Sequence, residues 1–593
     1  MGSEDTKRLL LFFAIVFAIM LLWRPLFQKY MPQPPASPGS APAGGENAGS
    51  SQPSPAAAPA ASAKAAPALP PTPIEGGKAQ DIVVENDLYR ITFSTQGAVV
   101  TSWVLKKFQD QNDRPLDVVN QPACAQLGFP MSVTLPDAVL AEKFNSAVYA
   151  VEPGAAAGQT LHAPAQLKFV FSDGKAEVQK TFAFGDTYQV DAQVSAIEGG
   201  SYLPVGVAWT GGFGDYSLGQ GAVSAHSRAA YDTPAGLTTV QEKNLKAGLS
   251  VLGPLNYAGL EDLYFVAIFL PAHPQDAFRI SRPSWNPPDS TEKTPPAPFR
   301  AELAAATGRP LALGLFVAPK NLDLLRTMKP PLDALVDFGW FSFIAKPLFL
   351  ALRYIYDHWV HNYGWAIIIL TVVINFALFP LKLKSIHSAQ KMQKVAPIIK
   401  RIQDQYKQYK FNDPRKQKMN QEVMKVYSEH GINPLGGCLP MALQLPFLYG
   451  FYELLLTVIE LRHAPWIGCV KDLSLPDACH PFGIPIALLP TLMIISMFFM
   501  QKLTPMATAD PAQQRMMYVM PLMFGVIFYR LASGLVLYYM AANVIGIAQQ
   551  LIINRFIPAA SPASANPPAD KGPGGPESKG PRKGARKPVG VKN

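Results

Sequence analysis

Cysteine and the motifs of enzyme chemistry are scarce in this 593-residue sequence. It contains four cysteines, with no CxxC pair and no Cys/His cluster, which argues against a disulfide scaffold and against a structural zinc site. No Walker-type phosphate loop, zinc-enzyme motif or GxSxG sequence is present. These absences exclude the common enzyme classes, and we expect no cofactor, no bound metal and no small-molecule substrate.

Charged residues are also few, at 16% of the chain, and they are unevenly placed. Residues 382–430 hold twelve Lys/Arg against four Asp/Glu, and residues 557–593 hold seven against two. Hydrophobic residues, in contrast, make up 49% of the chain. Apolar segments combined with local positive charge are typical of a protein that crosses a membrane several times.

The N-terminal region contains an apolar run, residues 9–23, directly after Lys7 and Arg8. No small-residue cleavage site follows closely, which favours an uncleaved transmembrane anchor (residues 1–30) over a secretory signal peptide. Residues 31–78 are rich in Pro, Ala, Gly and Ser. Such a segment cannot form an apolar core, so we expect a disordered linker.

Residues 79–325 consist of short alternating runs separated by turn residues, such as YRITF at 89–93. Apolar side chains at every second position indicate strands with one buried face. Almost no helical periodicity interrupts this region, so we expect one large β-sandwich domain. The following residues 332–362 are aromatic and amphipathic, which predicts a helix in the membrane interface, although an ordinary domain helix would show the same spacing.

Five apolar segments follow, and with the anchor they predict a polytopic α-helical membrane protein of six transmembrane helices. Their bounds are residues 363–383, 435–460, 482–500, 516–530 and 533–556, with loops at 461–481 and 501–515. Four spans separate a basic segment (384–433) from a basic tail (557–593), and positive charge marks the cytoplasmic side. Both termini are therefore expected in the cytoplasm and the β domain outside.

The same topology places Cys469 and Cys479 in an outside loop, where a disulfide can persist. Both the paired and the free state stay open from the sequence. The span at 516–530 is short for a hydrocarbon layer of about 30 Å, so we expect the bilayer to thin locally around it.

The basic segment 384–433 has the pattern of two amphipathic helices. The second is bounded by Asp413 as N-cap, Pro414 at its first position and Gly431 after its end. We expect its apolar stripe to pair in an antiparallel hairpin with the stripe of the preceding helix; the two stripes are Met419, Val423, Val426 and Tyr427, and Ile398, Ile402, Tyr406 and Tyr409. The basic side chains signal topology or form a cytoplasmic contact surface, and the candidates are Lys394, Lys400, Arg401, Lys407, Arg415 and Lys416.

Several motifs in the apolar region occur in an order that resembles one known family. They are NPLGGCLP at 433–440, QLP at 444–446, ELRHAP at 460–465, FFMQK at 498–502, DPAQQRMM at 510–517 and SGLVLYY at 533–539. Together they resemble the YidC membrane-protein insertase family, over roughly residues 336–556. The anchor, linker and β domain are similar in layout to the long Gram-negative members.

The resemblance implies a β-supersandwich domain in the periplasm and a five-helix core in the inner membrane. That core would enclose a hydrophilic groove through which nascent membrane proteins are inserted and helped to fold, alone or with the Sec translocon. Ribosomes would contact the cytoplasmic loops and the basic tail. The alternative is a membrane-anchored periplasmic carbohydrate-binding module, because supersandwiches also occur in sugar mutarotases.

Polar side chains within the spans are candidates for lining such a groove, or for holding helices together. They are Thr371, Asn375, Gln444, Tyr539 and Asn543. Many bacterial relatives of the family place an arginine at the position of Asn375. Because asparagine carries no charge, we expect this site to be neutral in the present sequence. Glu453 is an intramembrane carboxylate and hence a functional candidate, and we expect it to pair with Arg530.

Overall fold

The computed structural model describes residues 73–152, 160–218, 227–241, 244–245, 248–285, 298–409, 413–432, 439–479, 487–503 and 511–556. The predicted anchor, most of the linker and the basic tail lie outside these residues. The chain divides into two compact units. The first comprises residues up to Val373, Gln444–Ile494 and Phe524–Ala542; the second comprises Ile374–Leu443, Ile495–Met523 and the residues from Asn543.

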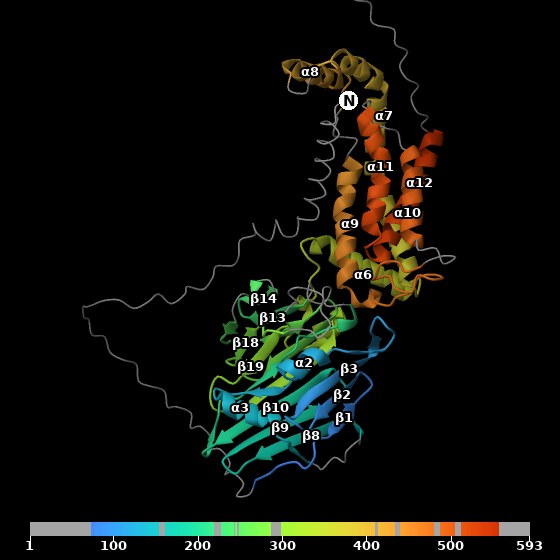
Figure 1. Cartoon of the computed structure of the whole chain (residues 1–593). Coiled ribbons are helices and arrows are strands. Elements are labelled where there is room, and N and C mark those ends of the chain that lie inside the picture. Colours follow the sequence, from blue (N-terminus) through green and yellow to red (C-terminus); the bar gives the residue numbers. More distant parts are fainter. Residues whose placement is uncertain are drawn as a thin grey trace, which may run out of the picture. The chain divides into compact units, whose positions relative to one another are not determined.

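The β domain belongs to the first unit, and its described strands form three sheets. The largest has the order β14 (Gly236–Gln241), β13 (Arg228–Thr233), β16 (Tyr257–Glu261), β17 (Phe265–Pro271), β20 (Leu311–Pro319), β10 (Gln189–Glu198), β9 (Ala176–Phe184), β8 (Ala165–Ser172) and β6 (Ala150–Glu152), with β11 (Ser201–Tyr202) paired to β10. Its pairings are antiparallel. In Figure 1, β8, β9 and β10 run side by side, as the pairing requires.

Two smaller sheets complete the domain. One has the order β4 (Pro115–Asp117), β3 (Val99–Gln109), β2 (Tyr89–Ser94), β1 (Asp81–Glu85) and β7 (Thr160–His162), of which β1 and β7 are parallel. The other has the order β15 (Leu249–Val251), β18 (Ala277–Ser281), β19 (Arg300–Ala304), β12 (Gly206–Trp209) and β5 (Ser132–Thr134). Short helical segments lie between the strands, namely α2 (Gln121–Leu127), α3 (Ala138–Ser146) and η1 (Tyr216–Leu218), and two more follow the last strand, α5 (Leu322–Thr327) and η3 (Asp333–Leu335).

Alternation along the strands explains why this region folds as sheets. In β10, Val190, Ala192 and Val194 are buried while Asp191 and Gln193 are exposed, which is the period of two that one buried face requires. The strands β16 and β17 are buried along almost their whole length. The expectation of a β domain in this part of the chain is therefore confirmed.

One lysine lies inside the β-domain core. Lys180 on β9 has no exposed surface, and its ammonium donates hydrogen bonds to the carbonyl oxygens of Gly97, Ala98 and Met131 at 2.7, 3.0 and 2.8 Å. Burial lowers the pKa of Lys180 to about 7. The three carbonyls belong to turns, so this side chain fastens two turns to the large sheet.

The helical part begins with α6 (Ser342–His358), which is shorter than the amphipathic segment predicted at 332–362. Its buried face includes Leu348, Leu352 and Ile355. Phe343, at 70% exposed, and Tyr354, at 55%, lie on the uncovered side. Apolar side chains therefore occupy both faces of this helix, one packed in the protein and one open.

The remaining helices are α7 (Tyr363–Gln405), α8 (Pro414–Glu429), α9 (Leu439–Thr457), η5 (Ile459–Leu461), α10 (Leu488–Leu503), α11 (Pro511–Phe528) and α12 (Ser533–Phe556). Among the described residues, α7 and α12 are long and apolar enough to cross a membrane, and α10 and residues 518–528 of α11 form shorter apolar helices. The predicted count of six spans is thus larger than the described residues provide.

The bounds of α7 and α11 also differ from the sequence prediction. The helix α7 continues without a break through Pro380 and Pro397, joining the predicted span 363–383 to the first helix of the basic segment. Each proline removes one backbone hydrogen bond and bends a helix, but the flanking residues are good helix formers and carry it on. The helix α11 begins at Pro511, five residues before the apolar run.

The hairpin of the second unit confirms one expectation and corrects another. Asp413 caps α8 by accepting a hydrogen bond from the backbone N–H of Arg415, as predicted. The predicted partner face on α7 is wrong at Ile398, while Tyr406 of that face donates a hydrogen bond to Glu422 of α8 at 2.9 Å. Val423, Val426 and Tyr427 pack against a buried cluster of Met392, Val395, Ile399 and Ile432, whereas Ile398 is exposed. At a spacing of three and four residues, Met392, Val395 and Ile399 continue along the chain to the predicted Ile402, Tyr406 and Tyr409. Ile398 is therefore the residue of the predicted stripe that lies on another face.

Candidate functional site

The second unit brings three polar side chains together on α7 and α12. Asn375 is 5% exposed and Gln549 is 8% exposed. The ammonium of Lys382 lies 2.6 Å from Oδ1 of Asn375 and 3.4 Å from Oε1 of Gln549. The amide of Gln549 also donates from Nε2 to the carbonyl oxygen of Asn375, at 3.5 Å. We refer to these three residues as the Lys382 cluster.

The Lys382 cluster corrects the expectation that the site at Asn375 is neutral. Lys382 follows Asn375 by seven residues, which is two helical turns, and side chains in a helix tilt toward its N-terminus. The lysine therefore reaches back along α7 to the asparagine. From the sequence, Lys382 was counted with the positive charge of residues 382–430, although its spacing of seven from Asn375 was a signal that could have placed it at this site. Gln549 lies on another helix, and its position in the sequence gave no signal of its contact with Asn375.

The cation of this cluster has no acidic partner among the described residues. Its hydrogen bonds go to two neutral amide oxygens, and α10, α11 and α12 contain no Asp or Glu at all. In α7 the single acidic residue is Asp404, near the far end. A cation held among apolar helices without a carboxylate costs free energy, so such groups mark functional positions.

The other predicted groove residues lie in separate groups. Thr371 is fully buried, and its hydroxyl donates to the carbonyl oxygen of Ile367 at 2.6 Å. Asn543 donates to the hydroxyl of Ser496 at 3.1 Å, within the second unit. Tyr539, in the first unit, packs on Phe528 with ring centroids 5.2 Å apart. Gln444 on α9 is half-buried.

Glu453 and Arg530 are not brought together in the described part of the chain. Glu453 is 3% exposed, and its carboxylate lies against Gly339, where a Cβ atom would come within 3.0 Å of it. Gly339 has a φ of 69°, so glycine serves both the backbone conformation and the close approach. Arg530 is exposed at the end of α11.

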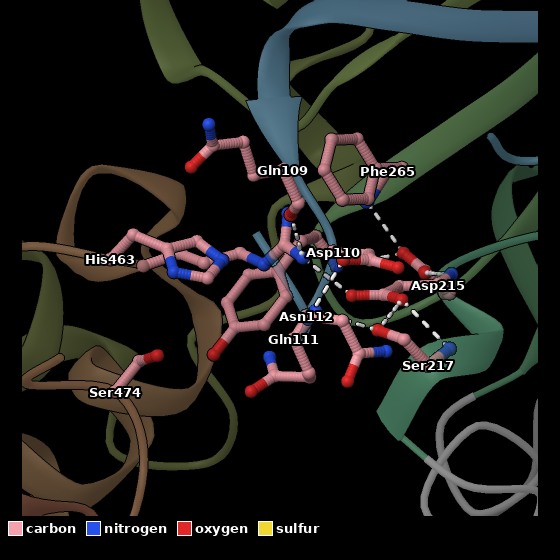
Figure 2. A network of polar contacts seen from close by, with 12 residues as sticks. Gln109, Asp110, Gln111, Asn112, Asp215, Ser217, Phe265, His463 and Ser474 are labelled. Carbon is pink, nitrogen blue, oxygen red and sulfur yellow. Dashed lines mark hydrogen bonds and ion pairs between the residues drawn. The ribbon is translucent and has the colours of Figure 1, made fainter. Parts of the chain in front are cut away.

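A second polar network lies in the first unit, between the β domain and the loop that follows η5. The side chain of Arg462 is 2% exposed and that of Asp215 is 1% exposed, and they form an ion pair of 2.5 Å. The same guanidinium nitrogen donates to the carbonyl oxygen of Gln109 at 2.7 Å. Figure 2 shows Gln109, at the end of β3, and Asp215, the two residues with which Arg462 forms these contacts.

Further contacts fix Asp215 and enclose the arginine. Asp215 accepts hydrogen bonds from the backbone N–H and the hydroxyl of Ser217, as drawn in Figure 2. The guanidinium carbon of Arg462 lies 5.8 Å from the ring centroid of Tyr264 and 5.3 Å from that of Phe265. Burial raises the pKa of Tyr264 to about 12, so the phenol stays neutral beside the cation.

Cys469 and Cys479 are joined by a disulfide in the structure, with their Cα atoms 5.1 Å apart. Between them, Asp472 accepts hydrogen bonds from the backbone N–H and the hydroxyl of Ser474. The predicted contact residues of the hairpin are exposed, except for the half-buried Lys416. Arg415 stacks on Tyr409, with its guanidinium carbon 4.1 Å from the ring centroid.

An all-β domain followed by long apolar helices with polar groups between them defines a membrane protein with a large domain outside the bilayer. The model of the 60Kd inner membrane protein family matches residues 355–560, and that of the YidC periplasmic domain matches residues 81–351. The chain belongs to the YidC family of membrane protein insertases. It is an inner-membrane protein with a periplasmic β domain.

Individual relatives match over most of their length. A membrane protein insertase YidC of Geobacter metallireducens is 32% identical, over 84% of this chain and 90% of the relative. One from Syntrophus aciditrophicus is 31% identical, over 82% of this chain and 86% of the relative. A solved structure of an active YidC insertase, with its first transmembrane domain resolved, is 18% identical with a TM-score of 0.34, over 81% of this chain and 94% of that chain.

Proposed function

We propose that this protein inserts nascent membrane proteins into the inner membrane and assists their folding, without acting as an enzyme. The observation that supports this proposal most strongly is the 32% identity to a named insertase over 84% of the chain, a share that includes both the β domain and the helices. A carbohydrate-binding module on an anchor would have no use for the shared helical part. The family relationship therefore favours the insertase over that alternative.

The physical task of an insertase is to carry a polar flank across a hydrocarbon layer. Unsatisfied polar groups at membrane depth cost several kcal/mol each. We assign Thr371, Asn375, Gln444, Tyr539 and Asn543 to a hydrophilic groove that offers substitute partners. Lys382 adds a positive charge at Asn375, supported by its 2.6 Å contact with that side chain, and would attract carboxylates of an entering flank.

The proposed topology has six transmembrane helices, with both termini in the cytoplasm. The basic residues of 384–433 and 557–593 then face the cytoplasm. Exposed side chains such as Lys394 and Lys400 on α7 suit contacts with nascent chains, the Sec translocon or ribosomal RNA, whose phosphates attract lysine and arginine. The basic tail suits the ribosome or anionic lipid.

Reconstitution tests the proposed function. Vesicles containing the purified full chain and no translocon should insert a small single-span protein without ATP, while protein-free vesicles should not. Depletion in cells should leave such substrates in the cytoplasm. Equal insertion by loaded and empty vesicles would contradict the proposal.

Photocrosslinking tests the groove assignment separately. Crosslinkers at positions 371, 375 and 539 should capture a nascent chain that is being inserted. Position 343, an exposed phenylalanine on α6, provides the control and should capture little. If the three groove positions capture no more than the control, the groove lies elsewhere.

A further inference from the structure

One loop, residues 461–475, contacts the outer ends of two helices and the β domain. At the start of α7, the side chain of Asn362 donates to the carbonyl oxygens of Pro465 and Trp466, both at 3.1 Å. At the start of α12, Ser533 donates from its N–H to the carbonyl oxygen of Leu475 at 2.6 Å and from its hydroxyl to that of Asp472 at 2.5 Å. All of these residues belong to the first unit.

Two glycines show how closely this loop is packed on the helices. A Cβ atom at Gly364 would lie 2.2 Å from the ring of Trp466, and one at Gly534 would lie 3.0 Å from the carbonyl oxygen of Leu473. Neither distance is available to a larger residue without movement of the loop. The loop therefore sets where α7 and α12 begin, and these helices carry Thr371 and Tyr539.

The loop is held to the β domain by Arg462, at its first turn. The ion pair with Asp215 and the hydrogen bond to the Gln109 carbonyl both use Nη2, and the pair is almost completely buried. Removing one partner of such a pair leaves an uncompensated buried charge. The connection is reinforced nearby, because Asn321 of the β domain donates to Glu460 at 2.8 Å.

We propose that Arg462 is a positioning residue for membrane insertion. Through its buried pair with Asp215, the β domain braces the loop 461–475, and this loop fixes the outer ends of the two helices that line the proposed groove. The β domain thereby contributes a rigid support and not merely an attached module. This inference rests on the proposed insertase function for its effect on activity, but the brace itself is a structural claim that can be tested alone.

Spin labels test the brace directly in the full-length protein. Labels at positions 107 and 471 replace exposed lysines of β3 and of the loop. With Arg462 and Asp215 unchanged, the distances between the two labels should form one narrow distribution. Arg462→Met should broaden it, Asp215→Asn should broaden it less because the asparagine keeps the shape, and Arg462→Lys should restore much of the narrow distribution.

A matched control changes an ion pair that lies on the surface of the same domain. Lys168 and Glu152 pair at 3.0 Å with side chains 35% and 59% exposed, so Lys168→Met should leave the distribution unchanged. Unaltered distributions in both Arg462→Met and Asp215→Asn would overturn the brace.

Insertion into vesicles tests whether the brace affects activity. Arg462→Met should insert a single-span substrate at least several-fold more slowly, and Arg462→Lys should recover most of the rate. A broadened distribution with a normal insertion rate would overturn the positioning role. Failure of the unmodified protein to insert any substrate would instead refute the proposed function, while the distance measurement would still decide on the brace.

Discussion

The two compact units each contain a cation among buried groups, Arg462 in the first and Lys382 in the second. The two cations differ in the partners that surround them. Arg462 meets a carboxylate, a carbonyl oxygen and two aromatic rings. Lys382 meets two amide oxygens and, among the described residues, no carboxylate. A cation whose counter-charge is built in supports structure. A cation whose counter-charge must come from outside is available for binding, and this difference separates the proposed brace from the proposed groove.

The largest expected effect is the loss of the arginine. Arg462→Met should lower the free energy of unfolding by about 3–5 kcal/mol, because Asp215 is left buried and uncompensated. The double variant Arg462→Met/Asp215→Leu should be less destabilised than the single one. Thermal unfolding of the full chain in detergent measures both, and a shift no larger than that of Lys168→Met would contradict the contrast drawn above.

Lys180 extends the comparison to a buried cation whose hydrogen bonds go to carbonyl oxygens and whose ammonium lies 5.6 Å from the centroid of the Tyr149 ring. Lys180→Met should cost about 3 kcal/mol, since it strands buried acceptors. The pKa is lowered from 10.5 to about 7 in the folded state, so the unfolded chain binds more protons between these values. Stability should therefore rise as pH increases from about 7 toward 10.

The pH dependence can be assigned by comparing unfolding temperatures of the unmodified protein and Lys180→Met across that range. The variant should lose the rising component. Identical slopes in the two proteins would show that the hydrogen bonds to Gly97, Ala98 and Met131 keep the ammonium charged throughout.

The disulfide of the braced loop gives a smaller effect. Replacing Cys469 and Cys479 by serine opens a loop closed over a sequence separation of 10, for which chain entropy predicts a loss of about 2–3 kcal/mol. Mass spectrometry of unreduced protein should find the two joined, and reductant should lower the unfolding temperature of the unmodified protein only. Free thiols at both positions would refute the pairing.

The smallest expected change in stability is at Lys382. Lys382→Met removes a partly buried charge that has neutral partners, so the unfolding temperature should change by less than the equivalent of about 1 kcal/mol or rise slightly. A loss as large as that of Arg462→Met would show that Lys382 is structural, and the comparison would fail.

The β domain could be predicted from the sequence because the alternation of apolar and polar residues along a strand is a local signal, as at Val190, Ala192 and Val194. The N-cap at Asp413 was local as well. Contacts between distant segments left no such trace: Asp215 precedes Arg462 by 247 residues. Ile398 was misassigned in the hairpin because it neighbours Ile399 in the sequence, and the packing of Val423 and Val426 shows that Ile399 is the buried one.

The candidate site was predicted in part for the same reason. Asn375 was recognised by its polarity within an apolar span. The charge beside it was not, because Lys382 lies at the end of the predicted span 363–383 and helix geometry sets the direction of its side chain. Gln549 is supplied by another helix. The site therefore depends on three-dimensional arrangement that composition could not reveal.

The most direct measurement compares insertion of two single-span substrates that differ by Asp or Asn in the translocated flank, using vesicles containing the full chain. A charge-assisted contact is worth about 1.5–3 kcal/mol, so the acidic substrate should insert about tenfold faster or more. Lys382→Gln should abolish this preference, while Lys384→Gln, at the exposed neighbour on α7, should preserve it. Equal insertion of both substrates by the unmodified protein, or an unchanged preference in Lys382→Gln, would contradict the account.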